Sequence, residues 1–103
     1  MDYSDFIGRY CVVRARDASP HAGIVEDIDG RTVKMREARR LWRWRVLDKK
    51  GISLSEVAEY GIDAKDWSRV GVPTAVLIQD ACEVIVCSAS AEKTLRDIAV
   101  YQP

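Results

Sequence analysis

The alternation of apolar and polar residues predicts three strands in the first third of the chain. The segment 9–15 is rich in β-branched and aromatic residues, a composition typical of strands. A second strand is expected over 22–28 and a third over 31–36. The dipeptide Asp29-Gly30 between them predicts a two-residue hairpin turn, because glycine readily adopts the positive φ that such a turn requires.

The same pattern indicates which side chains of these strands face the core. In the second strand, Ile24 and Ile28 are an even number of residues apart, so a regular strand places both on one face. In the third strand, Val33 and Met35 are expected to point inward, while the polar residues that alternate with them point to solvent. The turn-forming segment 17–20 separates the first strand from the second.

The segment 38–46 combines arginine with tryptophan and fits two periodicities. Helical spacing would align four residues on one face: Ala38, Leu41, Trp44 and Leu47. Strand alternation would instead place an arginine, two tryptophans and a valine together: Arg40, Trp42, Trp44 and Val46. The opposite face of that strand would carry three arginines and a leucine: Arg39, Leu41, Arg43 and Arg45. We favour the strand, because the segment continues a series of strands and is rich in aromatic residues.

Two helices are predicted in the second half of the chain. Ser53 and Glu56 have the spacing of a capping box, in which each side chain satisfies a free backbone amide at a helix start. Gly61 is well placed to end that helix. Ser88 or Ser90 is placed to cap a second short helix near the end of the chain.

These elements together predict a small α+β domain that is mainly β. Two further apolar strands are expected over 74–78 and 82–87. The expected architecture is an antiparallel sheet or an SH3-like barrel of five to six strands with two short helices. At 103 residues, the segment 1–103 is interpreted as a single domain.

The composition is that of an ordinary globular protein, with 48% hydrophobic and 31% charged residues. No apolar run reaches transmembrane length, and residues 1–5 lack the basic start of a secretory signal, so a cytoplasmic protein is expected. Three cysteines without C-x-x-C spacing argue against a disulfide framework. All three lie in apolar runs and are expected to be small core residues: Cys11, Cys82 and Cys87.

Charge is balanced over the whole chain but not along it. Residues 1–50 carry twelve basic against eight acidic side chains, whereas residues 51–103 carry four against eight. The two halves are therefore +4 and −4. Such asymmetry either steers an anionic ligand to one face or lets two halves or two subunits attract one another.

No catalytic or metal-binding constellation stands out. A single histidine and scattered carboxylates give neither a metal site nor an acid–base pair, so we expect no enzyme, no cofactor and no metal. His21, which follows Pro20, is either a turn residue bonded to backbone or a residue at the rim of a ligand pocket. Glu83 lies in an apolar strand, where a buried carboxylate needs an arginine, and the segment 39–45 is the expected source of a structural ion pair.

Five segments occur in an order that resembles a known protein family. They are Ser19-Pro20-His21-Ala22-Gly23, Asp29-Gly30, Arg39-Arg40-Leu41-Trp42-Arg43-Trp44, Ser53-Leu54-Ser55-Glu56 and Glu83-Val84-Ile85-Val86-Cys87. Over residues 7–95 the chain resembles a family of small bacteriophage and prophage proteins recorded only as a domain of unknown function. The chain departs from the family pattern at Val86, often a proline, and at Arg43, often an aromatic residue. The resemblance implies a phage origin and a host-cytoplasm setting, and it implies no activity.

The function that these features favour is binding without catalysis. A phage accessory protein of this size is expected to antagonise host defence, either by sequestering a nucleotide-like signalling molecule or by occluding a defence protein. For a nucleotide, Arg39 and Arg40 would hold phosphates, Trp42 or Trp44 would stack the base, and His21 would lie at the pocket rim. A homo-oligomer is expected to enclose the ligand, because so small a chain has little room for an internal pocket.

Two alternatives use the same arginines and tryptophans differently. The segment would pack as an interface if the chain were a structural or assembly protein of the phage particle. It would track a single strand if the chain were a nucleic-acid-binding module. The zero net charge weighs against the second alternative, because proteins that track phosphates are usually basic. No membrane partner is expected.

Overall fold

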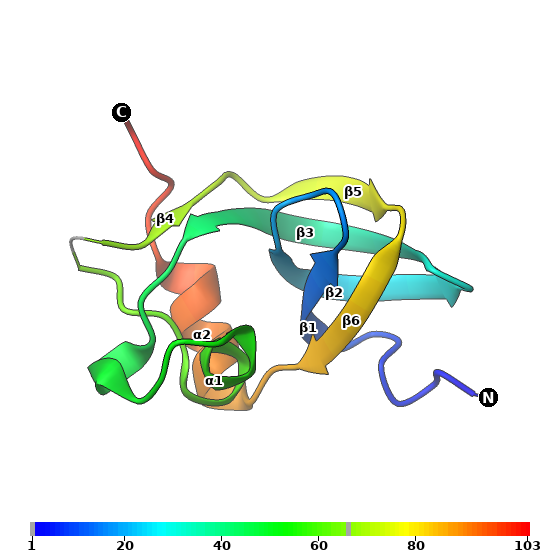
Figure 1. The fold of residues 1–103 in the computed structure, drawn as a ribbon, viewed down its shortest axis with the longest axis horizontal. Coiled ribbons are helices and arrows are strands. Elements are labelled where there is room, and N and C mark those ends of the chain that lie inside the picture. Colours follow the sequence, from blue (N-terminus) through cyan, green and yellow to red (C-terminus); the bar gives the residue numbers. More distant parts are fainter. Residues whose placement is uncertain (1, 66) are drawn as a thin grey trace.

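The computed structural model describes residues 2–65 and 67–103, which form a mainly β fold with two short α-helices (Figure 1). Six strands follow one another along the chain: β1 (Tyr10–Ala15), β2 (His21–Asp29), β3 (Thr32–Arg43), β4 (Arg69–Val70), β5 (Thr74–Ile78) and β6 (Ala81–Val86). The helical elements are η1 (Leu47–Lys49), α1 (Leu54–Tyr60) and α2 (Ala89–Asp97). The predicted fold class, α+β and mainly β, is confirmed.

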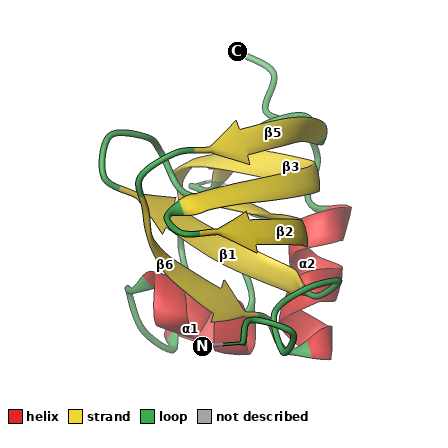
Figure 2. Cartoon of the chain, turned by 90° about the vertical axis from the view of Figure 1, so that its right-hand side faces the viewer, coloured by secondary structure: helices red, strands yellow, loops and turns green. Residues whose placement is uncertain are grey.

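The strands form one antiparallel sheet that curls around its own inner face (Figure 2). The order is β4-β3-β2-β1-β6, and β5 pairs with β3 on the same side as β4. A short turn joins β5 to β6, yet these two strands do not pair with each other within the described residues. The sheet is therefore open, and of the two predicted architectures it matches the antiparallel sheet and not a closed barrel.

The Arg/Trp segment lies in β3, the longest strand. The predicted third strand and the Arg/Trp segment are one continuous strand, Thr32–Arg43, and the helical alternative is wrong. Strands pair with β3 along both of its edges, so its backbone groups are satisfied in the sheet and not in a helix. The strand ends after Arg43, so the strict alternation expected to continue through Val46 stops there.

The core has two parts that meet across β1. The helix-side core lies between the sheet and the helices and includes Tyr10 and Val12. The inner core lies within the curl of the sheet and includes Cys11 and Val13. A strand buried on both faces reads as a continuous apolar run, as β1 does. The predicted inward side chains of the third strand, Val33 and Met35, belong to the inner core: the exposed fraction of each is 1%.

Bulges change the face on which some side chains lie. Ile24 packs in the helix-side core and Ile28 packs against the inner core, so the prediction that they share one face is wrong. The pairing register shifts between Val25 and Asp27, and an extra residue in one strand reverses the alternation beyond it. A second irregularity lies in β3, where Glu37 has a φ of 52°, unusual for a residue other than glycine.

Local signals placed both helices correctly. The Glu56 carboxylate accepts the backbone N–H of Ser53 at 3.3 Å, which confirms the capping box before α1. Gly61 ends this helix with a φ of 105°. Ser88 caps α2, where its hydroxyl accepts the backbone N–H of Ala91 at 3.1 Å. Short-range hydrogen bonds therefore define where the helices begin.

The cysteines do not all lie in the core. Cys11 and Cys87 are buried, but Cys82 is exposed, so its predicted core position is wrong. Cys82 lies on β6, an edge strand that is only partly covered. Burial raises the pKa of Cys11 to about 11 and that of Cys87 to about 12. None of the helices in the described part of the chain has the length and apolarity to cross a membrane.

Candidate ligand-binding site

Three of the five predicted ligand-binding residues line one cavity of about 230 Å³. These are His21 from the start of β2 and Arg40 and Trp42 from the end of β3. The remaining walls come from β5 and the segment before it: Gly71, Val72, Thr74 and Val76. We call this cavity the His21 pocket.

Strand pairing brings the predicted residues together. His21 is the direct partner of Arg40 in the antiparallel pair of β2 and β3, and Trp42 lies two residues further along the same face of β3. The two strands approach closely here at Gly23, because a Cβ added to this residue would lie 2.6 Å from the Cα of Ala38. Glycine at this position therefore allows the register that sets the imidazole beside the guanidinium.

His21 is a buried polar residue with an unused nitrogen. Its exposed fraction is 2%, and its Nδ1 has no hydrogen-bond partner among the described residues. Burial, together with the positive charge of Arg40, lowers the pKa of His21 below its usual value, an effect that the nearby backbone of Ser19 opposes. A buried nitrogen without a partner is unfavourable, and a hydrogen bond from a bound molecule would stabilise it.

Arg40 and Trp42 supply charge and a ring surface beside this imidazole. Arg40 is exposed, and none of the ion pairs among the described residues involves it. Trp42 is 53% exposed, and its ring meets that of Tyr101 edge to face, with centroids 6.3 Å apart. An arginine without a carboxylate and a solvent-facing indole are suited to hold an anionic group and a flat ring.

Arg39, predicted to hold phosphates, is instead a structural residue. Only 3% of it is exposed. Its guanidinium donates to the backbone carbonyls of Gly71 at 2.8 Å, Leu95 at 2.9 Å and Ile98 at 2.6 Å. Arg39 thus ties β3 to the segment before β5 and to the end of α2, where free carbonyls attract a cation. It does not lie in the His21 pocket.

Trp44 lies outside the His21 pocket because β3 ends at Arg43. It packs against the helix-side core, and its indole N–H donates to the carbonyl of Ile52 at 3.2 Å. Trp44 lines a second, more open hollow of about 330 Å³ beside the first, which we call the Trp67 hollow. Of its lining residues, only Trp42 also lines the His21 pocket. The complete lining of the hollow is Trp42, Arg43, Trp44, Ile52 and Trp67.

Glu83 forms an ion pair, but with a different arginine from the one expected. Its Oε1 lies 3.0 Å from the Nε of Arg14 on the neighbouring strand β1. Both side chains are largely exposed, at 42% for Glu83 and 51% for Arg14. The expectation of a buried carboxylate paired with the segment 39–45 is therefore wrong. A pair this exposed contributes little to stability.

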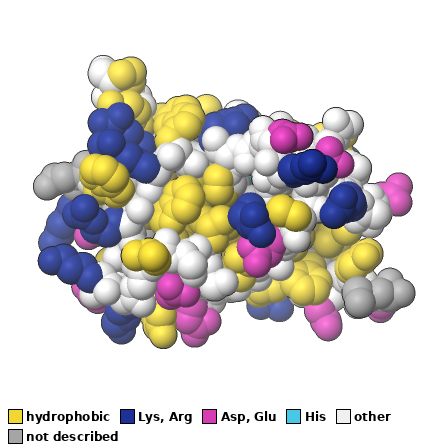
Figure 3. Space-filling view, in the orientation of Figure 1, with side chains coloured by type: hydrophobic (Ala, Val, Ile, Leu, Met, Phe, Trp, Pro, Cys, Tyr) yellow, Lys and Arg dark blue, Asp and Glu magenta, His cyan; other side chains and the backbone are white. Residues whose placement is uncertain are grey.

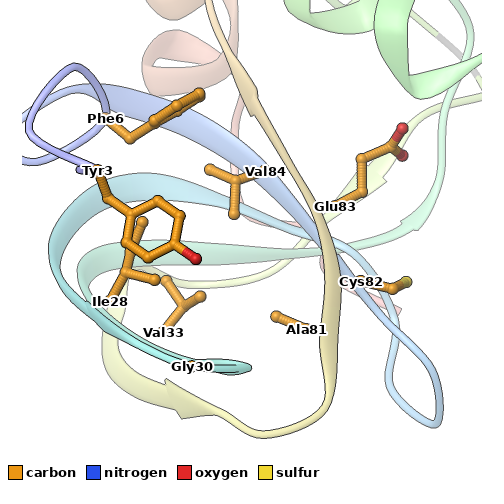
Figure 4. A pocket seen from close by; sticks show the side chains of 9 residues that line it. All are labelled: Tyr3, Phe6, Ile28, Gly30, Val33, Ala81, Cys82, Glu83 and Val84. Carbon is orange, nitrogen blue, oxygen red and sulfur yellow. The ribbon is translucent and has the colours of Figure 1, made fainter. Parts of the chain in front are cut away.

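A separate cavity of about 270 Å³ lies beside the N-terminal segment (Figure 4). Its walls are mostly apolar and come from the N-terminal segment, the β2–β3 hairpin and β6: Tyr3, Phe6, Ile28, Gly30, Val33, Ala81, Cys82, Glu83 and Val84. In the close view, the Glu83 carboxylate points away from the ring of Tyr3. This cavity contains none of the predicted ligand-binding residues.

Several residues near the His21 pocket were not predicted from the sequence. The loop before β4 supplies Trp67, which receives the guanidinium of Arg43 over its ring at 4.0 Å. Tyr101 comes from the segment after α2 and receives Arg69 in the same way at 4.3 Å. Figure 3 shows basic and hydrophobic side chains interleaved at this end of the molecule, on the left. The only sequence signal for Trp67 and Tyr101 was that each is an aromatic residue outside the predicted helices and strands.

A family described as "Domain of unknown function (DUF6948)" matches residues 8–95. The chain belongs to this family. The DUF6948 match includes every residue that lines the His21 pocket and the Trp67 hollow, and it ends before Tyr101. No curated protein and no solved structure matches the chain. The predicted membership of a family of unknown function is confirmed, and the description of the family names no activity.

Proposed function

We propose that this DUF6948 protein is a non-enzymatic binding protein that sequesters a nucleotide-like molecule in the His21 pocket. The observation that carries the proposal is the pairing of His21 with Arg40. A buried imidazole with an unpartnered nitrogen lies directly across the sheet from an arginine that has no ion pair among the described residues. Both groups gain partners when an anionic ligand binds.

Each side chain has a distinct part in this binding. Arg40 holds a phosphate group, because its guanidinium offers several donors in a rigid fork. Trp42 stacks against the base with its solvent-exposed ring. His21 exchanges a hydrogen bond with the ligand through Nδ1, whose tautomer follows the partner it meets.

The composition of the pocket supports binding and not catalysis. Besides His21, its lining residues carry neither a carboxylate nor a thiol that would act as a base or nucleophile. The aliphatic side chains of Val72 and Val76 form part of the wall, which suits a flat ring. Val72 is 58% exposed. A second copy of the chain seated there would enclose the ligand, in line with the expected homo-oligomer.

The biological setting forms part of the proposal. The sequence resemblance to bacteriophage and prophage proteins suggests that the protein works in the cytoplasm of an infected bacterium. There, a small protein that removes a nucleotide signal would antagonise a defence system of the host. Sequestration requires no chemical reaction. It requires only that the Kd for the signalling molecule is lower than the concentration of that molecule.

A thermal-shift screen tests the proposal, with cyclic dinucleotides, cyclic trinucleotides and cyclic ADP-ribose isomers as probes. We expect one class to raise the Tm by several degrees, because a ligand that binds only the folded state stabilises it. Arg40→Ala and Trp42→Ala should remove the shift. Arg36→Ala is the matched control, since Arg36 is an exposed arginine on the same strand but outside the pocket.

Two results would contradict this function. One is a well-folded protein that none of the probes stabilises. The other is a shift that survives Arg40→Ala and Trp42→Ala unchanged, which would place the ligand elsewhere. Recovery of the protein in purified virions would instead favour a structural role in the particle.

A further inference from the structure

The His21 pocket and the Trp67 hollow share one lining residue. Trp42 lines both of them. The hollow continues from Trp42 along Arg43 and Trp44 to the exposed side chains of Ile52 and Trp67. Ile52 is 89% exposed and Trp67 is 43% exposed. A continuous surface with a hydrophobic far wall therefore extends beyond the pocket that holds His21.

Positive charge lines both parts of this surface. Arg40 lies in the His21 pocket and Arg43 in the Trp67 hollow, three residues apart on β3. Arg43 is held in place, because its Nε donates to the carbonyl of Trp67 at 2.8 Å while its guanidinium covers the indole ring. Arg45 also approaches this ring, at 5.5 Å from the centroid. The second hollow therefore combines a fixed cation with exposed aromatic area.

The size of each space also matters. Small-molecule sites commonly measure roughly 300–1,000 Å³. The His21 pocket, at about 230 Å³, is smaller than this range, and the Trp67 hollow, at about 330 Å³, is at its lower end. Each space suits one ring-bearing unit. Together they suit a molecule of two such units that passes over Trp42.

We propose that the ligand is a dinucleotide, with one nucleotide in the His21 pocket and the second in the Trp67 hollow. This inference rests on the proposed function, since it extends the same site. Trp42 separates the two bases and contacts both, Arg40 binds the phosphate of the nucleotide in the His21 pocket, and Arg43 lies beside the nucleotide in the Trp67 hollow. The second base lies against Trp44 and the edge of Trp67 that Arg43 leaves open, with Ile52 as the outer wall.

Calorimetric titration with mononucleotides and linear dinucleotides tests this extension. The probes are AMP and GMP, together with the 5′-phosphorylated dinucleotides pApA and pGpG. Stacking of one base on an aromatic side chain is worth enough to tighten binding about tenfold. We expect the better dinucleotide to bind the wild-type protein at least about tenfold more tightly than its mononucleotide.

Two substitutions in the Trp67 hollow test whether this hollow is the source of the tighter binding of the dinucleotide. Trp67→Ala and Ile52→Ser should reduce the preference for the dinucleotide to less than about threefold while leaving mononucleotide affinity unchanged. Tyr3→Ala is the control, because it truncates a partly exposed aromatic residue that lines the separate cavity beside the N-terminal segment. Thermal unfolding of each variant confirms that it remains folded under the titration conditions.

The outcomes separate the two proposals. Equal affinity for mononucleotides and dinucleotides, or equal weakening of both by Trp67→Ala, overturns the dinucleotide proposal and leaves the His21 pocket as a mononucleotide site. Affinity that keeps rising with six-nucleotide strands also overturns it, in favour of a nucleic-acid-binding surface. Failure of all four probes to bind overturns the dinucleotide proposal, and the thermal-shift screen then decides whether the wider function stands.

Discussion

Replacement of Arg39 tests the finding that this arginine, unlike its neighbour Arg40, serves the fold. Arg39→Met keeps an unbranched side chain of similar length in the buried space but removes every donor. The backbone carbonyls of Gly71, Leu95 and Ile98 then lose a partner that now lies 2.6–2.9 Å away. The substitution therefore isolates the hydrogen bonds from the packing of the side chain.

The expected loss follows from these contacts. A hydrogen bond to a charged group contributes about 1.5–3 kcal/mol, and the three bonds share one guanidinium whose burial is itself unfavourable. Burial lowers the pKa of Arg39, which is the sign of that cost. We therefore expect a net loss of about 3–5 kcal/mol, because each buried carbonyl left without a donor costs about 1–3 kcal/mol and the removed burial of the guanidinium offsets part of the sum. This loss is a large share of the free energy of unfolding of a typical domain, which is ~5–15 kcal/mol.

Urea unfolding at 25 °C, followed by tryptophan fluorescence and circular dichroism, measures this loss. The unfolding midpoint should fall with little change in the slope m. Thermal unfolding should show a decrease in Tm of at least about 12 °C for a domain of this size. Arg39→Lys should lose less, about 1–3 kcal/mol, because an ammonium group keeps the charge but not the fork of donors. Arg36→Met, at an exposed position on β3, should stay within about 0.5 kcal/mol of wild type.

A loss of less than about 1 kcal/mol for Arg39→Met would refute the reasoning, since bonds of this kind are worth more than that in a buried site. Ligand binding gives an independent check. Arg39→Lys should bind any ligand found in the thermal-shift screen with unchanged affinity, whereas Arg40→Lys should bind it more weakly. Equal effects of the two substitutions on affinity would contradict the division of roles between the adjacent arginines.

Two further predictions concern the cysteines and the histidine. In the native protein, Cys82 alone should react quickly with Ellman's reagent, because burial raises the pKa of the other two thiols to about 11 and about 12. We expect one fast-reacting thiol in the native protein and three after unfolding in urea. Three fast-reacting thiols in the native protein would be incompatible with the fold. The lowered pKa of His21 means that, below about pH 6.5, the unfolded chain binds a proton that the native state refuses, so its contribution to stability is complete above that pH and is lost as the pH falls. The free energy of unfolding of wild type should therefore decrease more than that of His21→Gln between pH 7.5 and pH 5, and parallel pH profiles would show that folding does not lower the pKa of this imidazole.

Local chemistry determined much of the secondary structure. The capping box of Ser53 and Glu56 and the hydroxyl of Ser88 act within a few residues, so the sequence predicts where both helices begin. Gly30 adopts a φ of 59° in the hairpin turn, which lies one residue later than predicted, at Gly30-Arg31, because Asp29 pairs with Thr32. The alternation that turned Val33 and Met35 inward also depends only on strand geometry.

The candidate site depended partly on alternation and partly on packing. Once the Arg/Trp segment is a strand, Arg40 and Trp42 must share a face, and this was predicted. The distinct fates of Arg39 and Arg40 were not, because adjacent arginines are chemically identical until α2 docks against one of them. Trp44 does not share a face with Arg40 and Trp42 as predicted, because β3 ends at Arg43.

The sequence by itself determined a mainly β domain with two capped helices and an arginine- and tryptophan-rich strand. Only the tertiary structure decided the register that sets His21 opposite Arg40, and the bulges that send Ile24 and Ile28 into different parts of the core. It also decided which distant residues meet the strand, such as Trp67. Helix caps and tight turns are fixed by neighbours along the chain, whereas pairing register and cavities depend on contacts between segments far apart in the sequence.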